Sequence, residues 1–157
     1  MKATKAAIVC VLLADCEDPG SRETPVSDTL PILWARAAPE SEETIERIEE
    51  IFGMEVVEVE SAWGAFSVFV YEDGTEERNG RASGYIPCGG SAWARDDYRT
   101  LAHEIGHLAG LEHTDLEGHL MRAPADEPFL LTEQELQQVR QVAGHHEQCR
   151  IQGQVPE

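Results

Sequence analysis

Basic side chains are scarce in this chain of 157 residues. Only 12 residues are Lys or Arg, against 30 Asp and Glu, so the formal net charge is −18. Such an acidic surface repels the phosphates of nucleic acids and of anionic lipids, and we therefore expect no nucleic-acid partner. Two explanations of the acidity stay open: a solvated surface that keeps the protein soluble, and an attraction for basic substrates.

Long apolar runs are also missing. The run of residues 6–14 follows two lysines and is too short to span a bilayer. It is typical of a signal peptide over residues 1–15, so we expect export to the cell envelope or secretion. Residues 13–16 read Leu-Ala-Asp-Cys and resemble the lipobox of bacterial lipoproteins, apart from the charged Asp15. The resemblance implies a lipid anchor on Cys16, with a plain secretory signal or a buried N-terminal strand as the alternatives.

Cysteine is equally sparse, with four residues. Cys10 lies in the predicted signal peptide, and Cys16 is the candidate for lipidation. Cys88 and Cys149 then remain as a pair in an oxidising compartment, where disulfides form and persist. We predict a disulfide between them, and two buried free thiols are the alternative.

Neither internal repeats nor low-complexity segments divide the chain, and its length is that of one ordinary domain. The proportions of apolar residues, 41%, and charged residues, 27%, are typical of globular proteins. Residues 16–30 are polar, lack apolar periodicity and are predicted to be an extended tether. Residues 31–157 are predicted to form one domain, which we expect to be monomeric.

Hydrophobic periodicity and turn residues predict both strands and helices in this domain. Strands are expected over residues 32–37, 54–60, 65–71, 81–87 and 91–94, with those at 54–60 and 65–71 as neighbours. Helices are expected from Ser41 to Gly53, from Asp96 and Asp97 onward, and from Thr132, with Glu135 in a capping box, to a stop at Gly144. The acidic segment 71–80 is either a solvated loop or a weak Ca²⁺ candidate. The predicted fold class is α+β.

The stretch from His103 to His113 carries the chemistry. On a helix, His103 and His107 lie about 40° apart around the axis and about 6 Å apart along it, so both imidazoles can reach one metal ion. Gly110 permits a positive φ after the helix, and the chain can then turn to bring His113 in as a third ligand. Three nitrogen ligands with one open position are typical of catalytic zinc. We predict one catalytic Zn²⁺ on these three histidines.

Glu104 follows the first ligand and lies off the metal-binding face of the helix. There its carboxylate can hydrogen-bond to the zinc-activated water, whose pKa zinc lowers to about 7. Glu104 can accept a proton as the water attacks a carbonyl and can return it to the leaving amine. We therefore predict that Glu104 is the general base in the hydrolysis of a peptide bond.

This eleven-residue stretch resembles the zinc signature of the metzincin metallopeptidases. Residues 120–124, Leu-Met-Arg-Ala-Pro, resemble the methionine-containing turn of that family, and the short gap between His113 and Met121 is most similar to matrixins. Pro124 falls one residue later than in matrixins, and no tyrosine follows Met121. The resemblance implies a metzincin-like zincin: a twisted mixed β-sheet, an active-site helix, a turn with Met121 beneath the zinc, and a C-terminal helix.

Met121 and the histidines outside the motif also have alternative interpretations. Met121 also fits ordinary core packing. His119 is an alternative third ligand, although it lacks the glycine-mediated spacing of His113. His145 and His146 are expected to be exposed residues at a helix end rather than ligands.

The motif and the resemblance together predict a zinc metalloendopeptidase. Its substrate, a peptide or protein, would pair with an edge strand over residues 81–86. One alternative is a zinc-retaining, non-catalytic peptide-binding module, against which the intact Glu104 argues. The other alternative is hydrolysis of a non-protein amide or an aminopeptidase-like activity.

Overall fold

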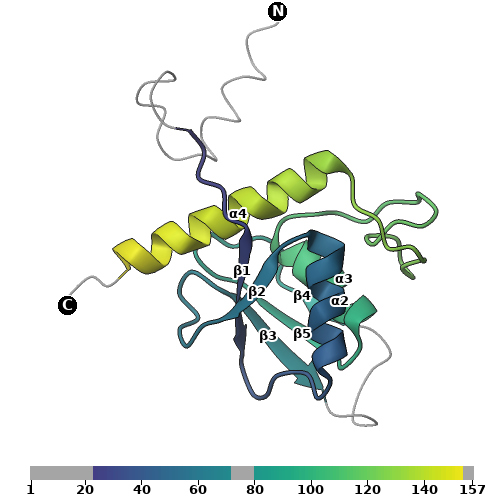
Figure 1. Cartoon of the computed structure of the whole chain (residues 1–157), viewed down its shortest axis with the longest axis horizontal. Helices are drawn as coiled ribbons and strands as arrows, with labels where there is room; N and C mark the ends of the chain where they lie inside the picture. The colour runs from purple at the N-terminus through teal and green to yellow at the C-terminus, as the bar shows by residue number, and fades with distance from the viewer. Residues whose placement is uncertain (1–22, 72–79, 154–157) are drawn as a thin grey trace, which may run out of the picture.

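The computed structural model describes residues 23–71 and 80–153 (Figure 1). The predicted signal peptide, Cys16 and residues 16–22 of the predicted tether lie outside the described residues. Residues 72–79, most of the segment considered for Ca²⁺, also lie outside them. Calcium gains no support from the part of the chain that is described.

A five-stranded sheet with the order β2-β1-β3-β5-β4 forms the centre of the described fold. Neighbouring strands run parallel, except that β4 is antiparallel to β5. The strands are β1 Thr29–Trp34, β2 Glu55–Glu58, β3 Phe66–Tyr71, β4 Arg81–Ala82 and β5 Ser91–Arg95. The helices of the described ranges are α2 Glu42–Phe52, α3 Tyr98–Leu108 and α4 Glu133–Gln152. This mixed sheet with its helices confirms the predicted α+β class.

The strands predicted at 54–60 and 65–71 are not neighbours, so that prediction was wrong. β1 lies between β2 and β3, and Ile32 pairs with Glu58 on one side and Phe66 on the other. Burial explains the order: Leu30 and Ile32 are fully buried, whereas β2 is mostly exposed. The strand with the more completely buried residues is central, and the exposed strand takes the edge.

The domain also begins earlier than predicted, because β1 starts at Thr29 rather than at residue 32. Ahead of it, the backbone N–H of Ser27 donates to the carbonyl oxygen of Arg140 on α4 at 3.1 Å. Figure 1 shows α4 crossing close to β1, against which it packs. Residues 27–30, which we assigned to the tether, are therefore part of the folded domain. The prediction failed because it relied on the polar side chains of this segment, whereas the segment is held by backbone hydrogen bonds.

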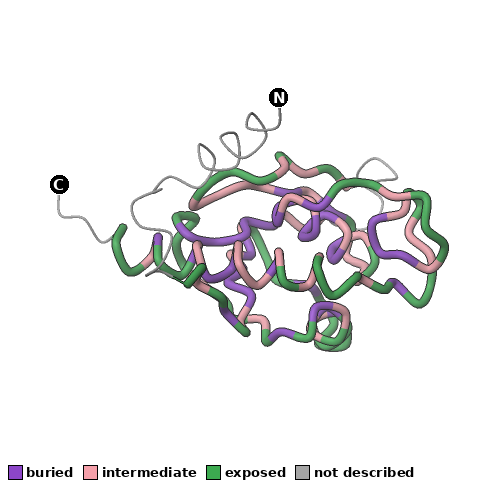
Figure 2. Tube along the Cα trace, turned by 90° about the horizontal axis from the view of Figure 1, so that it is seen from above, coloured by how far each residue is buried: buried purple, intermediate pink, exposed green. Residues whose placement is uncertain are grey.

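Helices α2 and α3 begin where the sequence predicts. Ser41 is the N-cap of α2, and Gly53 ends that helix with φ 61°. Helix α3 packs against α2 and against β3, β4 and β5. Its predicted apolar stripe is fully buried and consists of Leu101, Ile105 and Leu108. Figure 2 shows buried residues gathered in the interior and exposed residues around the outside.

The predicted disulfide between Cys88 and Cys149 is confirmed, with the two Cα atoms 5.6 Å apart. It joins α4 to the segment between β4 and β5. In that segment the predicted strand 81–87 shortens to β4, because Gly84 adopts φ 78° and interrupts the extended backbone. The disulfide therefore fixes a loop that the sheet itself does not hold.

Helix α4 does not stop at Gly144, as we predicted, but continues to Gln152. Gly144 serves a packing role instead, because a Cβ there would lie 2.5 Å from the carbonyl oxygen of Pro25. His146 is consequently not an exposed helix-end residue: it is fully buried, and its ring packs edge-on against Phe66. Among the described residues, no helix is both long enough and apolar enough for a membrane span.

Candidate metal centre

Helix α3 carries two of the three candidate histidine ligands, and its N-terminus is capped by a side chain. Asp97 is the N-cap, and its Oδ1 accepts from the backbone N–H of Thr100 at 2.8 Å. A carboxylate at this end also interacts favourably with the helix dipole. The buried stripe of α3 faces the sheet, so the remaining face is free to carry functional side chains.

Three histidine side chains converge at the end of α3, as the sequence predicts. The Nε2 atom of His113 lies 3.1 Å from Nε2 of His103 and 3.0 Å from Nε2 of His107. The candidate ligand atoms of all three residues lie within 4.8 Å of one another. Two of the rings come from adjacent turns of α3, and the third comes from the segment that follows it.

Gly110 provides the turn that brings His113 back. The helix ends at Leu108, and Gly110 has φ 84°, a conformation that costs glycine little. The side-chain amide of Gln138 on α4 donates to the carbonyl oxygen of Ala109 at 3.0 Å. The end of α3 is therefore held both by its own turn and by the C-terminal helix.

The hydrogen bonds of the rings define their protonation. Nδ1 of His103 lies 2.8 Å from the carbonyl oxygen of Leu120, and Nδ1 of His107 lies 2.9 Å from that of Leu111. A carbonyl oxygen only accepts, so each Nδ1 carries the hydrogen and each Nε2 presents a lone pair. Burial lowers the pKa of both rings, which favours the neutral form that binds metals.

These residues fit a zinc ion. His113 has at most one Nε2 hydrogen to share between two lone pairs, so hydrogen bonds alone cannot satisfy three converging Nε2 atoms. A cation satisfies all of them at once. In tetrahedral zinc sites with Zn–N bonds of about 2.0–2.1 Å, ligand nitrogens lie about 3.3 Å apart, close to the separations seen here.

Glu104 follows His103 on α3, and its side chain is nearly enclosed. Its side chain is 5% exposed, and burial raises its pKa to about 7. Gly80, just before β4, covers it: a Cβ on Gly80 would lie 2.8 Å from Oε1 of Glu104. The absence of a side chain at residue 80 therefore makes room for this carboxylate.

Met121 lies against Gly106 of α3 and is fully buried. A Cβ on Gly106 would lie 2.5 Å from its sulfur, so the glycine between the two ligands of α3 admits the methionine. The carbonyl oxygen of Met121 accepts from the backbone N–H of Thr114, next to His113, at 3.2 Å. Met121 thus contacts both segments that carry the candidate ligands.

The other histidines do not join this centre. His119 is 5% exposed and uses both ring nitrogens elsewhere, on Met121 and Glu135. His145 lies beside the disulfide, with Nε2 3.7 Å from the sulfur of Cys88. The potential ligand atoms of His145, Cys88 and Cys149 also lie within 4.8 Å of one another. The two sulfurs are bonded to each other, however, so neither is a thiolate that could bind a metal ion. The link from His119 to Glu135 was missed by sequence reasoning, which assigned Glu135 only to its capping box.

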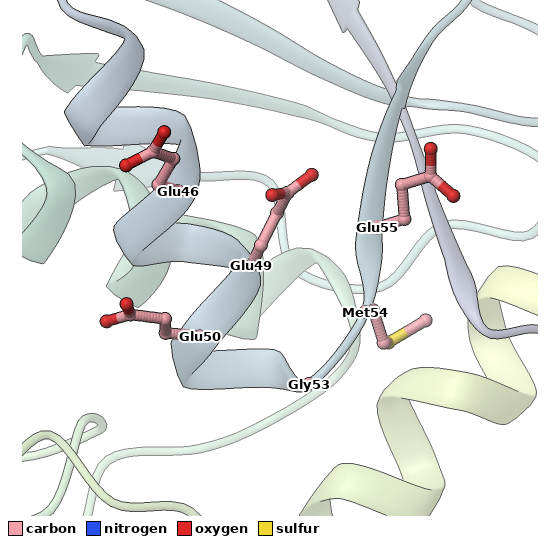
Figure 3. Close-up of a pocket in the computed structure, with 6 residues that line it drawn as sticks. All are labelled: Glu46, Glu49, Glu50, Gly53, Met54 and Glu55. Atoms are coloured by element: carbon pink, nitrogen blue, oxygen red, sulfur yellow. The ribbon is translucent and has the colours of Figure 1, made fainter.

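An acidic hollow lies between α2 and β2 and is separate from the histidines (Figure 3). The close-up shows its lining residues, none of which is a candidate zinc ligand: Glu46, Glu49, Glu50, Gly53, Met54 and Glu55. One carboxylate oxygen of Glu49 accepts from the backbone N–H of Val56 at 2.9 Å. Part of this acidity therefore serves to connect α2 to β2.

Comparisons with known proteins support the fold. No protein-family model matches this sequence, and no curated protein matches it. Among solved structures, the chain is similar to metalloproteinase-II from Bacteroides fragilis, with a TM-score of 0.50 and 19% sequence identity. The match covers 82% of this chain and 55% of that protein, so the chain spans about half the length of the protein it matches. At this identity the likeness concerns the fold, which is metalloproteinase-like.

Proposed function

We propose that this chain is a zinc-dependent endopeptidase of the metzincin type, with His103, His107 and His113 as ligands and Glu104 as general base. The observation that carries the proposal is the convergence of three Nε2 atoms, two of them from α3, the helix that also carries the nearly buried carboxylate of Glu104. Met121, buried against Gly106 between two of the proposed ligands, supports the metzincin type. The metalloproteinase-like fold is consistent with both.

Zinc held by His103, His107 and His113 would supply Lewis-acid chemistry, because it would polarise the scissile carbonyl and lower the pKa of the attacking water. The protein supplies the rest. Glu104 accepts a proton from the water as its oxygen attacks the carbonyl carbon, and later donates that proton to the leaving nitrogen as the C–N bond breaks. Enclosure by Gly80 restricts the positions that this carboxylate can take. His103 and His107 stay fixed through their Nδ1 hydrogen bonds.

The proposed substrate is an extended peptide bound along β4. This strand forms one edge of the described sheet and pairs on its other side with β5, so its outer backbone groups face no described strand. Tyr85 and Ile86 follow it and are both nearly half exposed. A peptide can add to such an edge by backbone pairing while neighbouring apolar side chains select its residues.

Incubation of the zinc-loaded protein with a random peptide library tests this function. Analysis of the products by mass spectrometry should show cleavage at internal bonds with a reproducible residue preference. Trimming of single N-terminal residues would instead indicate an aminopeptidase. Binding of peptides without any cleavage would contradict the proposal and favour a zinc-retaining binding module.

We further propose that the protein is exported and carries a lipid on Cys16. The disulfide between Cys88 and Cys149 supports an oxidising compartment. Mass spectrometry of the mature chain should find a new N-terminus at Cys16 with added acyl mass. A mature chain that still begins at Met1 would contradict export by this signal.

A further inference from the structure

His119 is a buried histidine that the proposed mechanism does not use. The backbone N–H of Met121 donates to its Nδ1 at 3.0 Å, so Nδ1 is the acceptor and the ring hydrogen sits on Nε2. Nε2 then donates to Oε2 of Glu135 at 2.8 Å. The ring thus connects the turn that contains Met121 to the first turn of α4.

Glu135 is itself fixed by the N-terminus of α4. Its Oε2 accepts from the backbone N–H of Thr132 at 2.8 Å and lies 3.0 Å from the hydroxyl of Thr132, which completes the predicted capping box. Burial alone would raise the pKa of Glu135, but the hydrogen bonds from Thr132 and His119 outweigh it and lower the pKa. The carboxylate that receives His119 is therefore charged and anchored.

At its other end, this connection reaches a candidate ligand. The carbonyl oxygen of Leu120, between His119 and Met121, accepts the Nδ1 hydrogen of His103 at 2.8 Å. That bond sets the tautomer of His103 and the direction of its Nε2 lone pair. Since His119 binds the N–H that follows Leu120, any shift of its ring moves the carbonyl that orients His103.

We propose that His119 is a positioning residue of the zinc site, which fixes His103 through the Leu120 carbonyl and is itself held by Glu135. The inference rests on the proposed zinc site. Loss of His119 would leave the buried N–H of Met121 without its acceptor, and the turn would shift to satisfy it. Loss of such supporting partners typically weakens metal binding or activity 10- to 100-fold.

Zinc affinity, measured by competition with a chromophoric chelator, tests this role without any substrate. His119→Leu and Glu135→Ala interrupt the same connection at successive points, so each should weaken zinc binding by about 10- to 100-fold. The double variant should be little worse than either single variant, because the two changes are coupled. The absorption spectrum of bound Co²⁺ should change in the same variants, because it reports the geometry of the ligands.

Two controls separate positioning from stability. Thr132→Ala removes one of the hydrogen bonds that hold the Glu135 carboxylate but leaves those from the Thr132 backbone N–H and from His119, so zinc affinity should fall clearly less than in Glu135→Ala despite a less stable helix. Glu135→Gln keeps an acceptor for His119 and a residue common in capping boxes, so it should largely restore the affinity lost in Glu135→Ala.

The results of these experiments distinguish a failure of the positioning role from a failure of the peptidase function. Zinc affinity and a Co²⁺ spectrum like those of wild type in both His119→Leu and Glu135→Ala would overturn the inference, even if both proteins melt earlier. If His119→Leu does not fold, the comparison of Glu135→Ala with Thr132→Ala decides in the same way. A wild-type protein that binds zinc but cleaves no peptide would refute the peptidase function, while weaker binding in the variants would still support positioning by His119.

Discussion

Buried His146 should make the protein less stable to unfolding at acidic pH. Its side chain is fully buried on α4 against Phe66, and within the described ranges neither ring nitrogen has a hydrogen-bond partner. Burial, together with the positive charges of His145 and Arg150, lowers its pKa to about 4. The folded protein therefore resists protonation of this ring much more than the unfolded chain does.

The sign and size of the effect follow from the two pKa values. Above the unfolded value of 6.5 the ring is neutral in both states and adds no pH dependence. Between pH 6.5 and about 4 the unfolded chain binds the proton more readily, so the free energy of unfolding falls as the pH falls. Linkage gives a loss of about 2 kcal/mol at about pH 5 and about 3 kcal/mol below pH 4.

Urea unfolding between about pH 7.5 and about pH 4.5 measures this loss, with a chelator present so that zinc release does not contribute. His146→Leu is the matched variant, because it removes the titrating group and keeps an apolar side chain against Phe66. The stability of wild type relative to the variant should fall by about 2 kcal/mol between pH 7.5 and pH 5. A difference that stays constant over this range would refute the reasoning.

Three further predictions concern the site and the disulfide. Glu104→Gln should keep fold and zinc while cleavage falls roughly 10²–10⁴-fold, and a zinc-loaded variant within a few-fold of wild type would contradict its role as base. Gly80→Ala should lower kcat, because the new Cβ would lie 2.6 Å from Cγ of Glu104. Gly89→Ala is the control and should not change kcat, since a Cβ there meets no atom within 4 Å. The same kcat in both variants would argue against enclosure of Glu104 by Gly80. Reduction of the Cys88–Cys149 disulfide, whose sequence separation is 61, should lower the free energy of unfolding by about 4 kcal/mol in urea titrations, and a loss below about 1 kcal/mol would be inconsistent.

Local signals made the helix starts and the histidine cluster predictable from the sequence. The start of α3 at Asp97, the capping box of α4 and the turn at Gly110 each depend on a few consecutive residues. The histidine cluster also follows from helix geometry plus one glycine. Such features need no knowledge of distant contacts.

The features that the sequence did not reveal depend on contacts between distant segments. The position of β1 between β2 and β3 reflects burial on the assembled sheet. Gly144 was predicted to stop a helix, but it makes room for the backbone of Pro25. His146 is buried against Phe66 of β3, and the bond from His119 to Glu135 crosses from one segment to another. A glycine or histidine alone does not indicate which partner it will meet.

The zinc content of the purified protein tests the central claim most directly. Elemental mass spectrometry should find one zinc per chain in wild type and little or none in His103→Ala, His107→Ala or His113→Ala, because each removes one of three converging ligands. His145→Ala, which changes a histidine outside the centre, should keep the full zinc content. A wild-type protein that retains no zinc after loading, or a His113→Ala variant with undiminished zinc, would contradict the account.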